Sequence, residues 1–178
     1  MSHLFTAIVA VALMLGTALT LTLVTLSSAD QTSIAWASRV DRGVDQSRTA
    51  LTLVEVDPSP ASTNVDLTLR NTGQTLLRGF DEWDVFAQYY TTTSNDGLTI
   101  MRLQYTSSTT PSHGEWTDVD IYVDASSSDV EVYDPGVLNP QEEAVLRIKI
   151  DPAIPASTSN RLVVAAPNGV SLEALFTR

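Results

Sequence analysis

A long apolar segment without a charged side chain opens this chain and limits what it can fold into. Residues 4–26 read LFTAIVAVALMLGTALTLTLVTL, and every Asp, Glu, Lys and Arg of the sequence comes later, from Asp30 onward. A helix of this length, at about 1.5 Å rise per residue, crosses a hydrocarbon core of about 30 Å. In lipid, only a helix satisfies the backbone polar groups of a single open segment. The segment is therefore predicted to be an apolar helix that needs lipid or other protein around it.

The threonines within this segment are compatible with that prediction. A threonine hydroxyl in a helix can donate a hydrogen bond to the carbonyl one turn earlier. Such bonds satisfy the hydroxyl within its own helix, so we expect these side chains to cost little in an apolar environment.

Three interpretations of the segment remain open from sequence alone. It is a signal peptide cleaved after Ser27-Ser28-Ala29, although no basic residue precedes it and it exceeds the usual core of about 7–15 residues. Alternatively, it is an ordinary membrane anchor, or a helix that leaves the membrane and packs in the centre of a filament of identical subunits, where Gly16 allows close approach. The polymerisation helix would then use Leu4, Phe5, Ile8, Val9, Val11, Leu13, Leu15, Leu19, Leu21 and Leu23.

Helical periodicity continues beyond the apolar run to about residue 48. Apolar residues recur at Ile34, Trp36, Val40 and Val44, close to the spacing of one helix face. This extension is either a neck between the membrane and the rest of the chain or a seam between neighbouring subunits, and the sequence does not separate the two.

From residue 49 onward the periodicity becomes that of strands. Val65, Leu67 and Leu69 alternate with polar residues, which is typical of a strand with one buried face. Gly73, in the turn Asn71-Thr72-Gly73, is expected to adopt a positive φ. Further strands are predicted at 49–56, 80–90, 98–105, 116–123, 143–150, 160–165 and 170–176. The pattern predicts a mainly β fold with one long N-terminal α-helix, followed by an antiparallel Ig-like β-sandwich head of about 7–9 strands.

These patterns divide the chain into two parts. Residues 1–48 are expected to form the hydrophobic helix and its amphipathic extension, as the membrane or filament core. Residues 49–178 are expected to form the β-sandwich head, which at about 130 residues can bury a core of its own.

Charge and composition narrow the classes of function. The sequence has 10 Lys and Arg against 21 Asp and Glu, a formal net charge of −11. So acidic a chain is a poor candidate for binding nucleic acid, which needs a basic surface. The absence of cysteine excludes disulfides, thiolate metal sites and cysteine nucleophiles. With only two histidines in the sequence, His-based metal sites and catalytic triads are nearly excluded.

The acidic residues of the head give no pattern of catalysis. In the segment WTDVDIYVD, alternation predicts Asp118 and Asp120 on the solvent face of a strand, with Val119, Ile121 and Val123 on the other face. The spacing lacks the Gly and terminal Glu of a calcium loop, so a surface Ca²⁺ site is only the alternative to a solvated face. No nucleophile elbow or phosphate-binding loop occurs. We therefore expect no catalytic residue, no cofactor and no metal site, and a protein that is not an enzyme.

Four motifs carry a family resemblance. Ser2-His3-Leu4 stands directly before the apolar helix, and residues 65–77 read as a strand, Asn-Thr-Gly and a second strand. Residues 134–142 resemble a "PG-x-L-N-P-G-E" turn with Gln141 where Gly is usual, and residues 163–170 resemble a closing "V-STPNG-V" hairpin. In this order and spacing, the motifs make the chain similar to archaellum proteins of the type IV filament superfamily, both FlaG and FlaF and the archaellins.

The resemblance implies two hypotheses of function. Archaellins bury an apolar N-terminal helix in a filament core and expose a β-rich head. The leading hypothesis is accordingly a structural subunit of an archaellum-like motility filament, which lies on the cell surface, has itself as partner and is inserted in the membrane before assembly. The alternative is a membrane-anchored FlaF/FlaG-like accessory protein that binds the cell envelope or S-layer as stator, with motor or envelope proteins as partners. A secreted enzyme or ligand-binding sandwich with a cleaved signal peptide is a third hypothesis, for which the residues of the head offer no catalytic pattern.

Overall fold

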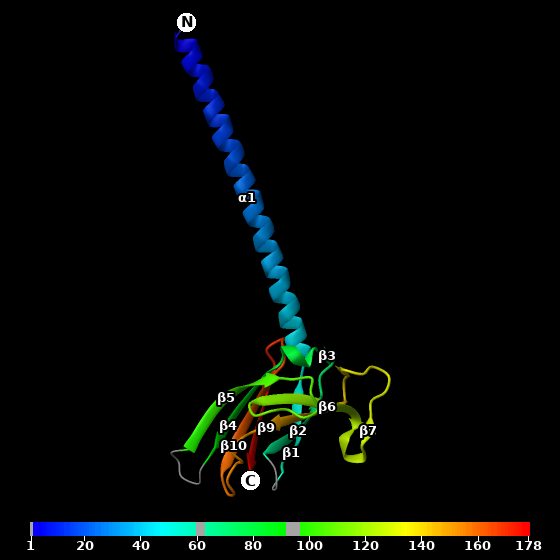
Figure 1. Ribbon diagram of the computed structural model, residues 1–178. Helices are drawn as coiled ribbons and strands as arrows, with labels where there is room; N and C mark the ends of the chain where they lie inside the picture. The colour runs from blue at the N-terminus through cyan, green and yellow to red at the C-terminus, as the bar shows by residue number, and fades with distance from the viewer. Residues whose placement is uncertain (1, 60–62, 92–96) are drawn as a thin grey trace. The chain divides into compact units, whose positions relative to one another are not determined.

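The computed structural model describes residues 2–59, 63–91 and 97–178 (Figure 1). The chain separates into two compact units, Met1–Val44 and Asp45–Arg178. The first unit is helical, and the second is the β-rich head together with the last turn of the helix. Each unit is described by itself.

Helix α1 spans Ser2–Arg48 as one uninterrupted element. No proline occurs within it, and its first half is rich in leucine and alanine, which are good helix formers. The hydroxyls of Thr17, Thr20, Thr22 and Thr25 each donate to the carbonyl four residues earlier, at 2.8–3.0 Å. The predicted hydrogen bonds from threonine hydroxyls to the preceding turn are thus confirmed for these four residues. Each of the four hydroxyls is satisfied within the helix.

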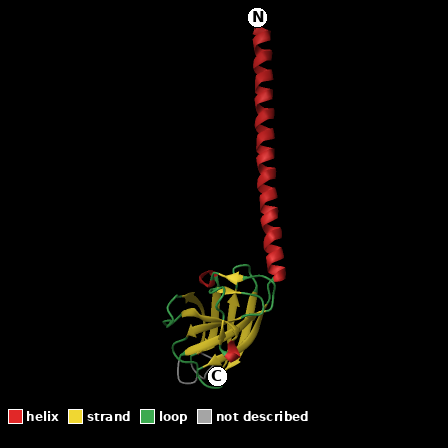
Figure 2. Ribbon diagram, turned by 90° about the vertical axis from the view of Figure 1, so that its right-hand side faces the viewer, coloured by secondary structure: helices red, strands yellow, loops and turns green. Residues whose placement is uncertain are grey.

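The main strands of the head lie close to the segments predicted from the sequence. The long strands are β1 (Leu51–Pro58), β2 (Asn64–Asn71), β4 (Asp84–Tyr90), β5 (Leu98–Tyr105), β6 (Glu115–Asp124), β9 (Glu143–Lys149), β10 (Ser159–Ala165) and β11 (Ser171–Thr177). The short elements are β3 (Leu77–Arg78), β7 (Asp129–Val130), β8 (Val137–Leu138) and the 3₁₀ helices η1 (Phe80–Glu82) and η3 (Ala125–Ser127). The prediction of a mainly β chain with a long N-terminal helix is confirmed (Figure 2).

In the part of the chain that the structure describes, nine strands form one sheet in the order β1-β2-β9-β6-β5-β4-β10-β11, with β7 paired to β6, and β3 pairs with β8 in a separate two-stranded sheet. Buried apolar side chains from β2, β9 and β6 and from β4, β10 and β11 belong to one core, so the sheet folds over that core in two layers. This arrangement is compatible with the predicted sandwich. One pairing differs from the antiparallel prediction: β5 and β6 are parallel over Gln104↔Glu115 and Tyr105↔Trp116. This short pairing lies where the chain passes from one layer to the other.

Strand β2 shows the predicted alternation, whereas β6 departs from it. Val65, Leu67 and Leu69 are at most 2% exposed. In β6 the register against β9 shifts between Asp118 and Asp120, as in a β-bulge. The predicted common solvent face of these two aspartates is therefore wrong. A bulge inserts one residue into the strand and thereby reverses the side-chain alternation that follows it. A prediction that assumes strict alternation along the strand cannot account for this reversal.

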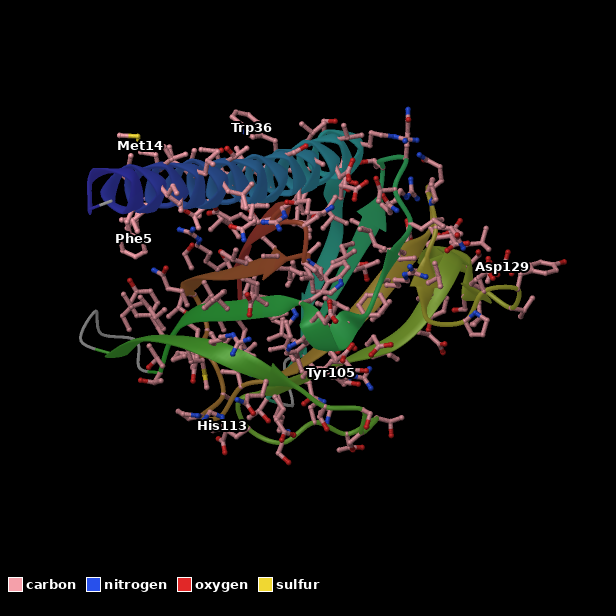
Figure 3. The ribbon with its side chains drawn as sticks, turned by 90° about the horizontal axis from the view of Figure 1, so that it is seen from above. Phe5, Met14, Trp36, Tyr105, His113 and Asp129 are labelled. Carbon is pink, nitrogen blue, oxygen red and sulfur yellow. The ribbon has the colours of Figure 1, made fainter. Side chains whose placement is uncertain are left out.

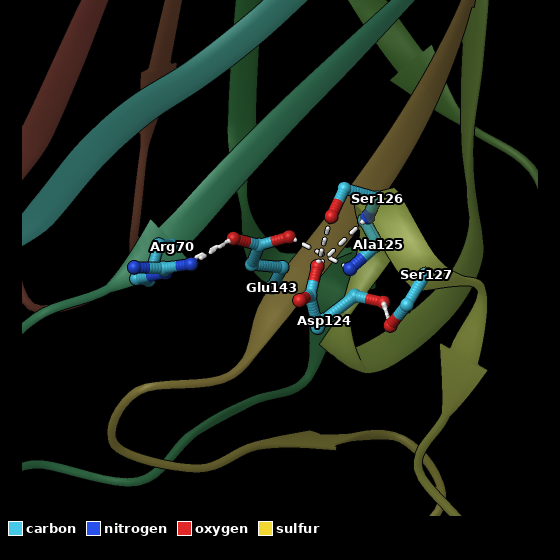
Figure 4. A network of polar contacts seen from close by, with 6 residues as sticks. All are labelled: Arg70, Asp124, Ala125, Ser126, Ser127 and Glu143. Carbon is cyan, nitrogen blue, oxygen red and sulfur yellow. Dashed lines mark hydrogen bonds and ion pairs between the residues drawn. The ribbon is translucent and has the colours of Figure 1, made fainter.

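A buried carboxylate joins three elements of the head. Glu143 in β9 is 2% exposed, and its Oε1 accepts a hydrogen bond from Arg70 Nε of β2 at 3.0 Å. Its Oε2 accepts a hydrogen bond from the backbone N–H of Ala125, at the start of η3, at 2.8 Å (Figure 4). Asp124 caps the same 3₁₀ helix by accepting from Ser126 N at 2.9 Å. Both oxygens of the buried acid are thus satisfied, as a buried charge requires.

The turn between β8 and β9 holds a non-glycine residue in the left-handed region. Glu142 N donates to Asn139 O at 3.2 Å, and Gln141 has φ 77°. With Pro140 before it, this is the geometry of a type II turn, whose third position favours glycine. The "PG-x-L-N-P-G-E" pattern has glycine at this position for that reason. Gln141 N also donates to Asn71 O at 2.7 Å, which ties the turn to the end of β2.

We expect Gln141→Gly to stabilise the head by about 0.5–1 kcal/mol, because relief of the left-handed strain exceeds the entropy cost of glycine. Urea unfolding of residues 45–178, followed by circular dichroism, measures the change. Thr109→Gly, in an exposed loop without a positive φ, is the matched control and should be neutral or destabilising. Equal effects of the two variants would contradict the assignment of strain to Gln141.

The Tyr105 hydroxyl donates to Asp118 Oδ1 at 2.8 Å. Burial, the hydrogen bond and the negative charge of this carboxylate raise the pKa of Tyr105 to about 12. An unfolded tyrosine titrates near pH 10. Because the folded pKa lies above the unfolded one, this stabilisation is complete below pH 10 and is lost as the pH rises through about 12.

The stability of the head should therefore fall between pH 10 and pH 12 more steeply in the wild type than in Tyr105→Phe. Urea midpoints at pH 8, 10, 11 and 12 test this. Tyr122→Phe, in which the pair of Tyr105 and Asp118 is intact, should retain the wild-type slope. A Tyr105→Phe slope equal to that of the wild type would refute the assignment.

Candidate functional site: an apolar helix and its junction with the head

The first half of α1 is the most apolar surface among the described residues. Ala7–Thr25 has a mean hydropathy of 2.4 and is long and apolar enough to cross a membrane, and none of it is buried by the rest of the chain. At about 1.5 Å per residue, such a segment extends for about 28 Å. Its surface therefore has to be covered by something outside the chain.

The predicted polymerisation residues lie on this surface. Phe5, Ile8, Val9, Val11, Leu13, Leu15, Leu19, Leu21 and Leu23 are between 42% and 72% exposed. The side chain of Leu4 lies outside the described residues. Figure 3 shows Phe5 and Met14 projecting from opposite sides of the helix. Because apolar side chains surround α1 on all sides, it is suited to a fully apolar environment rather than to one face of a soluble core.

The predicted neck residues lie on the second half of α1. Ile34, Trp36, Val40 and Val44 are between 47% and 70% exposed. Beside Trp36, the small side chains of Ser28, Thr32 and Ala35 leave a shallow groove of about 390 Å³ along the helix. Packed helices fit the side-chain ridges of one helix into the grooves of another, and a bulky aromatic next to a row of small residues provides such a ridge and groove.

The junction between helix and strands is formed by residues 45–50, which belong to the head unit. Thr49 is 7% exposed, and its hydroxyl donates to Asp45 O at 2.8 Å while it accepts from Asn168 Nδ2 at 2.7 Å. The Arg48 carbonyl accepts from Gln74 N at 2.7 Å. The end of the helix is thus bonded to two separate turns of the head.

Gly73 lies against this junction, and the reason why this residue is glycine differs from the predicted one. It is not among the glycines with positive φ, so that expectation was wrong. A Cβ on Gly73 would lie 2.5 Å from both Ala50 N and Arg48 O. Ala50 O accepts hydrogen bonds from the N–H groups of Thr72, at 2.9 Å, and Gly73, at 3.1 Å. Glycine is required here because two backbone segments meet, not because of its own dihedral angles.

The two turns at the junction belong to two of the four motifs that carried the resemblance. Asn71-Thr72-Gly73 contacts residues 48–50, and Pro167-Asn168-Gly169 supplies Asn168 to Thr49. Thr49 and Asn168 were not predicted as functional residues. The Asn and Gly residues predict a turn, but they do not indicate which other segment of the chain the turn contacts.

Within the described residues, no group of three or more His, Asp or Glu side chains is placed to hold a metal ion. Among the acidic residues of interest, Asp118 binds Tyr105, as described above. His113 Nδ1 accepts a hydrogen bond from Asp151 N at 3.0 Å, which gives it a structural partner in a loop.

A long apolar N-terminal helix and a β-rich head that includes the last turn of this helix define a class of two-part proteins whose helix needs lipid or other protein around it. The sequence profile described as "Archaeal-type flagellin" matches residues 2–176. The chain belongs to this archaeal-type flagellin family. A comparison with curated protein sequences found no match.

Solved structures with the same fold include both filament and stator proteins. A chain of the archaeal flagellum of Methanospirillum hungatei is 14% identical and covers 98% of this chain and 92% of its own, with a TM-score of 0.56. The archaellum periplasmic stator protein FlaG of Sulfolobus acidocaldarius is 16% identical and covers 72% of this chain and 99% of its own, with a TM-score of 0.52. A chain of the FlaF–FlaG stator complex of that organism is 17% identical and covers 71% and 87%, with a TM-score of 0.50. At these identities the likeness shows the fold.

Gly73→Ala should destabilise the head by about 1–3 kcal/mol, because the added Cβ forces two backbone segments apart. Thermal unfolding of residues 45–178, followed by fluorescence of the buried Trp83 and Trp116, measures the change. Thr72→Ala, at an exposed position of the same turn, is the control and should stay within about 0.5 kcal/mol of the wild type. Equal melting of the two variants would show that the close approach does not constrain residue 73.

Proposed function

We propose that this protein is the structural subunit of an archaellum-like cell-surface motility filament and polymerises through α1. The observation that carries the proposal is the apolar surface of Ala7–Thr25, none of which the chain buries itself. Membership of the archaeal-type flagellin family over residues 2–176 supports it. So does the likeness of fold to the Methanospirillum hungatei flagellum chain over 98% of this chain, a share that includes the helix.

The driving force of assembly follows from the same surface. Full burial of a Leu, Ile, Val or Phe side chain stabilises by about 1.5–3 kcal/mol, so a helix carrying many such side chains has to lie in lipid or among its own copies. The membrane holds it before assembly, and packed copies replace the lipid afterwards. Because the threonine hydroxyls of α1 bond within the helix, they can enter either environment without loss. Residues 1–48 then form the filament core, residues 49–178 its outer layer, and Ile34, Trp36, Val40 and Val44 the contacts between adjacent necks.

A stator-like accessory role is the second candidate. The observation that favours it is the likeness of fold to FlaG, which covers 99% of that stator protein. In this case α1 would remain in the membrane as an anchor, and the head would bind the cell envelope. A filament requires many copies per cell and a stator few, so abundance separates the two roles.

Quantitative mass spectrometry of head peptides tests this distinction. The full chain is expressed in an archaellated host that lacks its own copy, and filaments sheared from the cells are compared with washed membranes. We expect this protein to be the dominant species of the sheared fraction. Its restriction to the membrane fraction, while filaments of other subunits persist, would establish the stator role instead.

Leu13→Asp should abolish filaments, because a buried carboxylate in the middle of the apolar helix would be unpaired both in lipid and in a helix core. Electron microscopy and the protein content of the sheared fraction measure the loss. Leu76→Asp places the same charge on an exposed leucine of the head and should leave filaments at wild-type abundance. The head fragment 45–178 lacks residue 13 and reports separately that the head folds. Normal filaments from Leu13→Asp would show that α1 is not the core.

A further inference from the structure

Eight of the exposed large apolar side chains of the head lie on two surfaces that have no role in the core, and Leu53, Val54 and Leu76 lie elsewhere. The first, here called the loop patch, consists of Val123, Val130, Val132 and Tyr133 around β7. The second, here called the strand face, consists of Phe86, Leu98, Ile100 and Leu175 on the outer side of β4, β5 and β11. Figure 1 shows β7 on the opposite side of the head from β4 and β5, and Figure 3 shows Asp129 at one extreme of the same unit. One head thus carries two apolar surfaces that face different ways.

The loop patch displays an aromatic side chain to solvent. Tyr133 is 89% exposed and Val132 73% exposed, among the highest values of any large apolar side chain in the described parts of the chain. The segment is held in shape: Glu131 N donates to Ile121 O at 2.8 Å, and the Glu131 carboxylate accepts from the N–H groups of Tyr133 and Asp134. These backbone hydrogen bonds lower the pKa of Glu131, so its charge is retained. An ordered loop that exposes an aromatic loses little entropy when that aromatic is buried by a partner.

The strand face contains a groove suited to such a side chain. Strand register places Arg161 beside Gln88 and Gln88 beside Ile100, with Val163 beside Phe86 in the adjacent row. These residues line a groove of about 230 Å³ with an apolar floor. Ile100 is 68% exposed, although it lies in the middle of a paired strand. The groove is large enough for one aromatic side chain.

The loop patch is acidic, whereas the one charged residue among the described residues that line the groove is basic. The loop segment 129–137 carries Asp129, Glu131 and Asp134 and no basic residue. The charged residue that lines the groove is Arg161, whose side chain is 44% exposed and reaches Glu173 at 3.2 Å. Because this ion pair is open to solvent, Arg161 can also face a carboxylate of an incoming loop. In a chain with a net charge of −11, this basic residue makes the groove less repulsive to an acidic loop of another copy than the acidic parts of the surface are.

We infer that the Tyr133 loop of one subunit seats in the Phe86–Ile100 groove of a neighbouring subunit in the filament. The inference rests on the proposed polymer, which supplies a second copy at high local concentration. Two different surfaces on opposite sides of one head make a heterologous contact, which propagates from copy to copy instead of closing into a dimer. The contact adds to the packing of α1 and joins the heads of the outer layer. It also accounts for an exposed aromatic in a loop whose conformation is otherwise fixed.

Site-directed cross-linking of the full chain tests the contact, because the sequence has no cysteine of its own. Val132→Cys and Gln88→Cys are introduced together, which leaves Tyr133, Phe86 and Ile100 in place. Sheared filaments are treated with diamide, which oxidises paired thiols to a disulfide only when the two Cα atoms lie within about 7 Å. We expect a ladder of covalent oligomers on a non-reducing gel. The matched control, Val132→Cys with Leu76→Cys, should stay monomeric, because Leu76 belongs to neither surface.

Each outcome of this experiment is distinct. Filaments without a ladder, or with an equal ladder in the control, overturn the inferred contact and leave the filament proposal intact. The absence of this protein from wild-type filaments overturns the proposed function and the inferred contact with it.

A second variant covers the case in which cysteine at these positions prevents assembly. Tyr133→Ser should reduce the filament recovered after shearing by about tenfold, as expected for removal of an aromatic anchor. The melting temperature of the head should not change, because Tyr133 is almost fully exposed. Leu76→Ser should give wild-type recovery. Wild-type recovery with Tyr133→Ser would overturn the inference.

Discussion

An uncharged helix that its own chain cannot bury is the constraint on which the rest of this protein depends. The apolar residues of Ala7–Thr25 extend around all sides of α1, so no single soluble partner surface would cover them. Lipid or several copies of the same helix would, and both environments exclude unsatisfied polar groups. The hydroxyl bonds of Thr17, Thr20, Thr22 and Thr25 are consistent with either. Insertion in a membrane and packing in a filament would thus be two solutions to one solvation problem.

The last turn of the helix belongs to the head unit and is hydrogen-bonded to turns of the head. Thr49 is buried and bonded on both sides, and the Arg48 carbonyl and the Ala50 backbone meet the Asn71-Thr72-Gly73 turn. Load that passes from a helical core to an outer layer has to cross residues 45–50. In the proposed filament, such a junction has to resist separation, and several hydrogen bonds made by buried groups provide that resistance. The two turns of the junction also belong to two of the four motifs by which the sequence resembles archaellum proteins.

Much of the fold could be predicted because its signals are local. The helix to Arg48 follows from composition and period, and Val65, Leu67 and Leu69 follow from an alternation that β2 retains in full. The predictions were wrong where contacts with residues distant in the sequence interrupt a local pattern. The bulge in β6 reverses its faces beside β9, and β5 pairs with β6 in parallel where the chain changes layer. Neither the bulge nor the change of layer leaves a trace in the order of residues.

The sequence by itself determined that a helix too apolar for water precedes a β-rich head, because the solvation of side chains and their period are properties of adjacent residues. The resemblance of residues 134–142 to a known turn pattern also marked Gln141 as standing where glycine is usual. Only the tertiary structure decided why residue 73 is glycine, which turn holds Thr49, and that Glu143 is buried with both oxygens satisfied. It alone placed the loop of Tyr133 and the groove at Ile100 on different sides of one head. Those relations join residues far apart in the chain, and their energies depend on distances that only the folded structure sets.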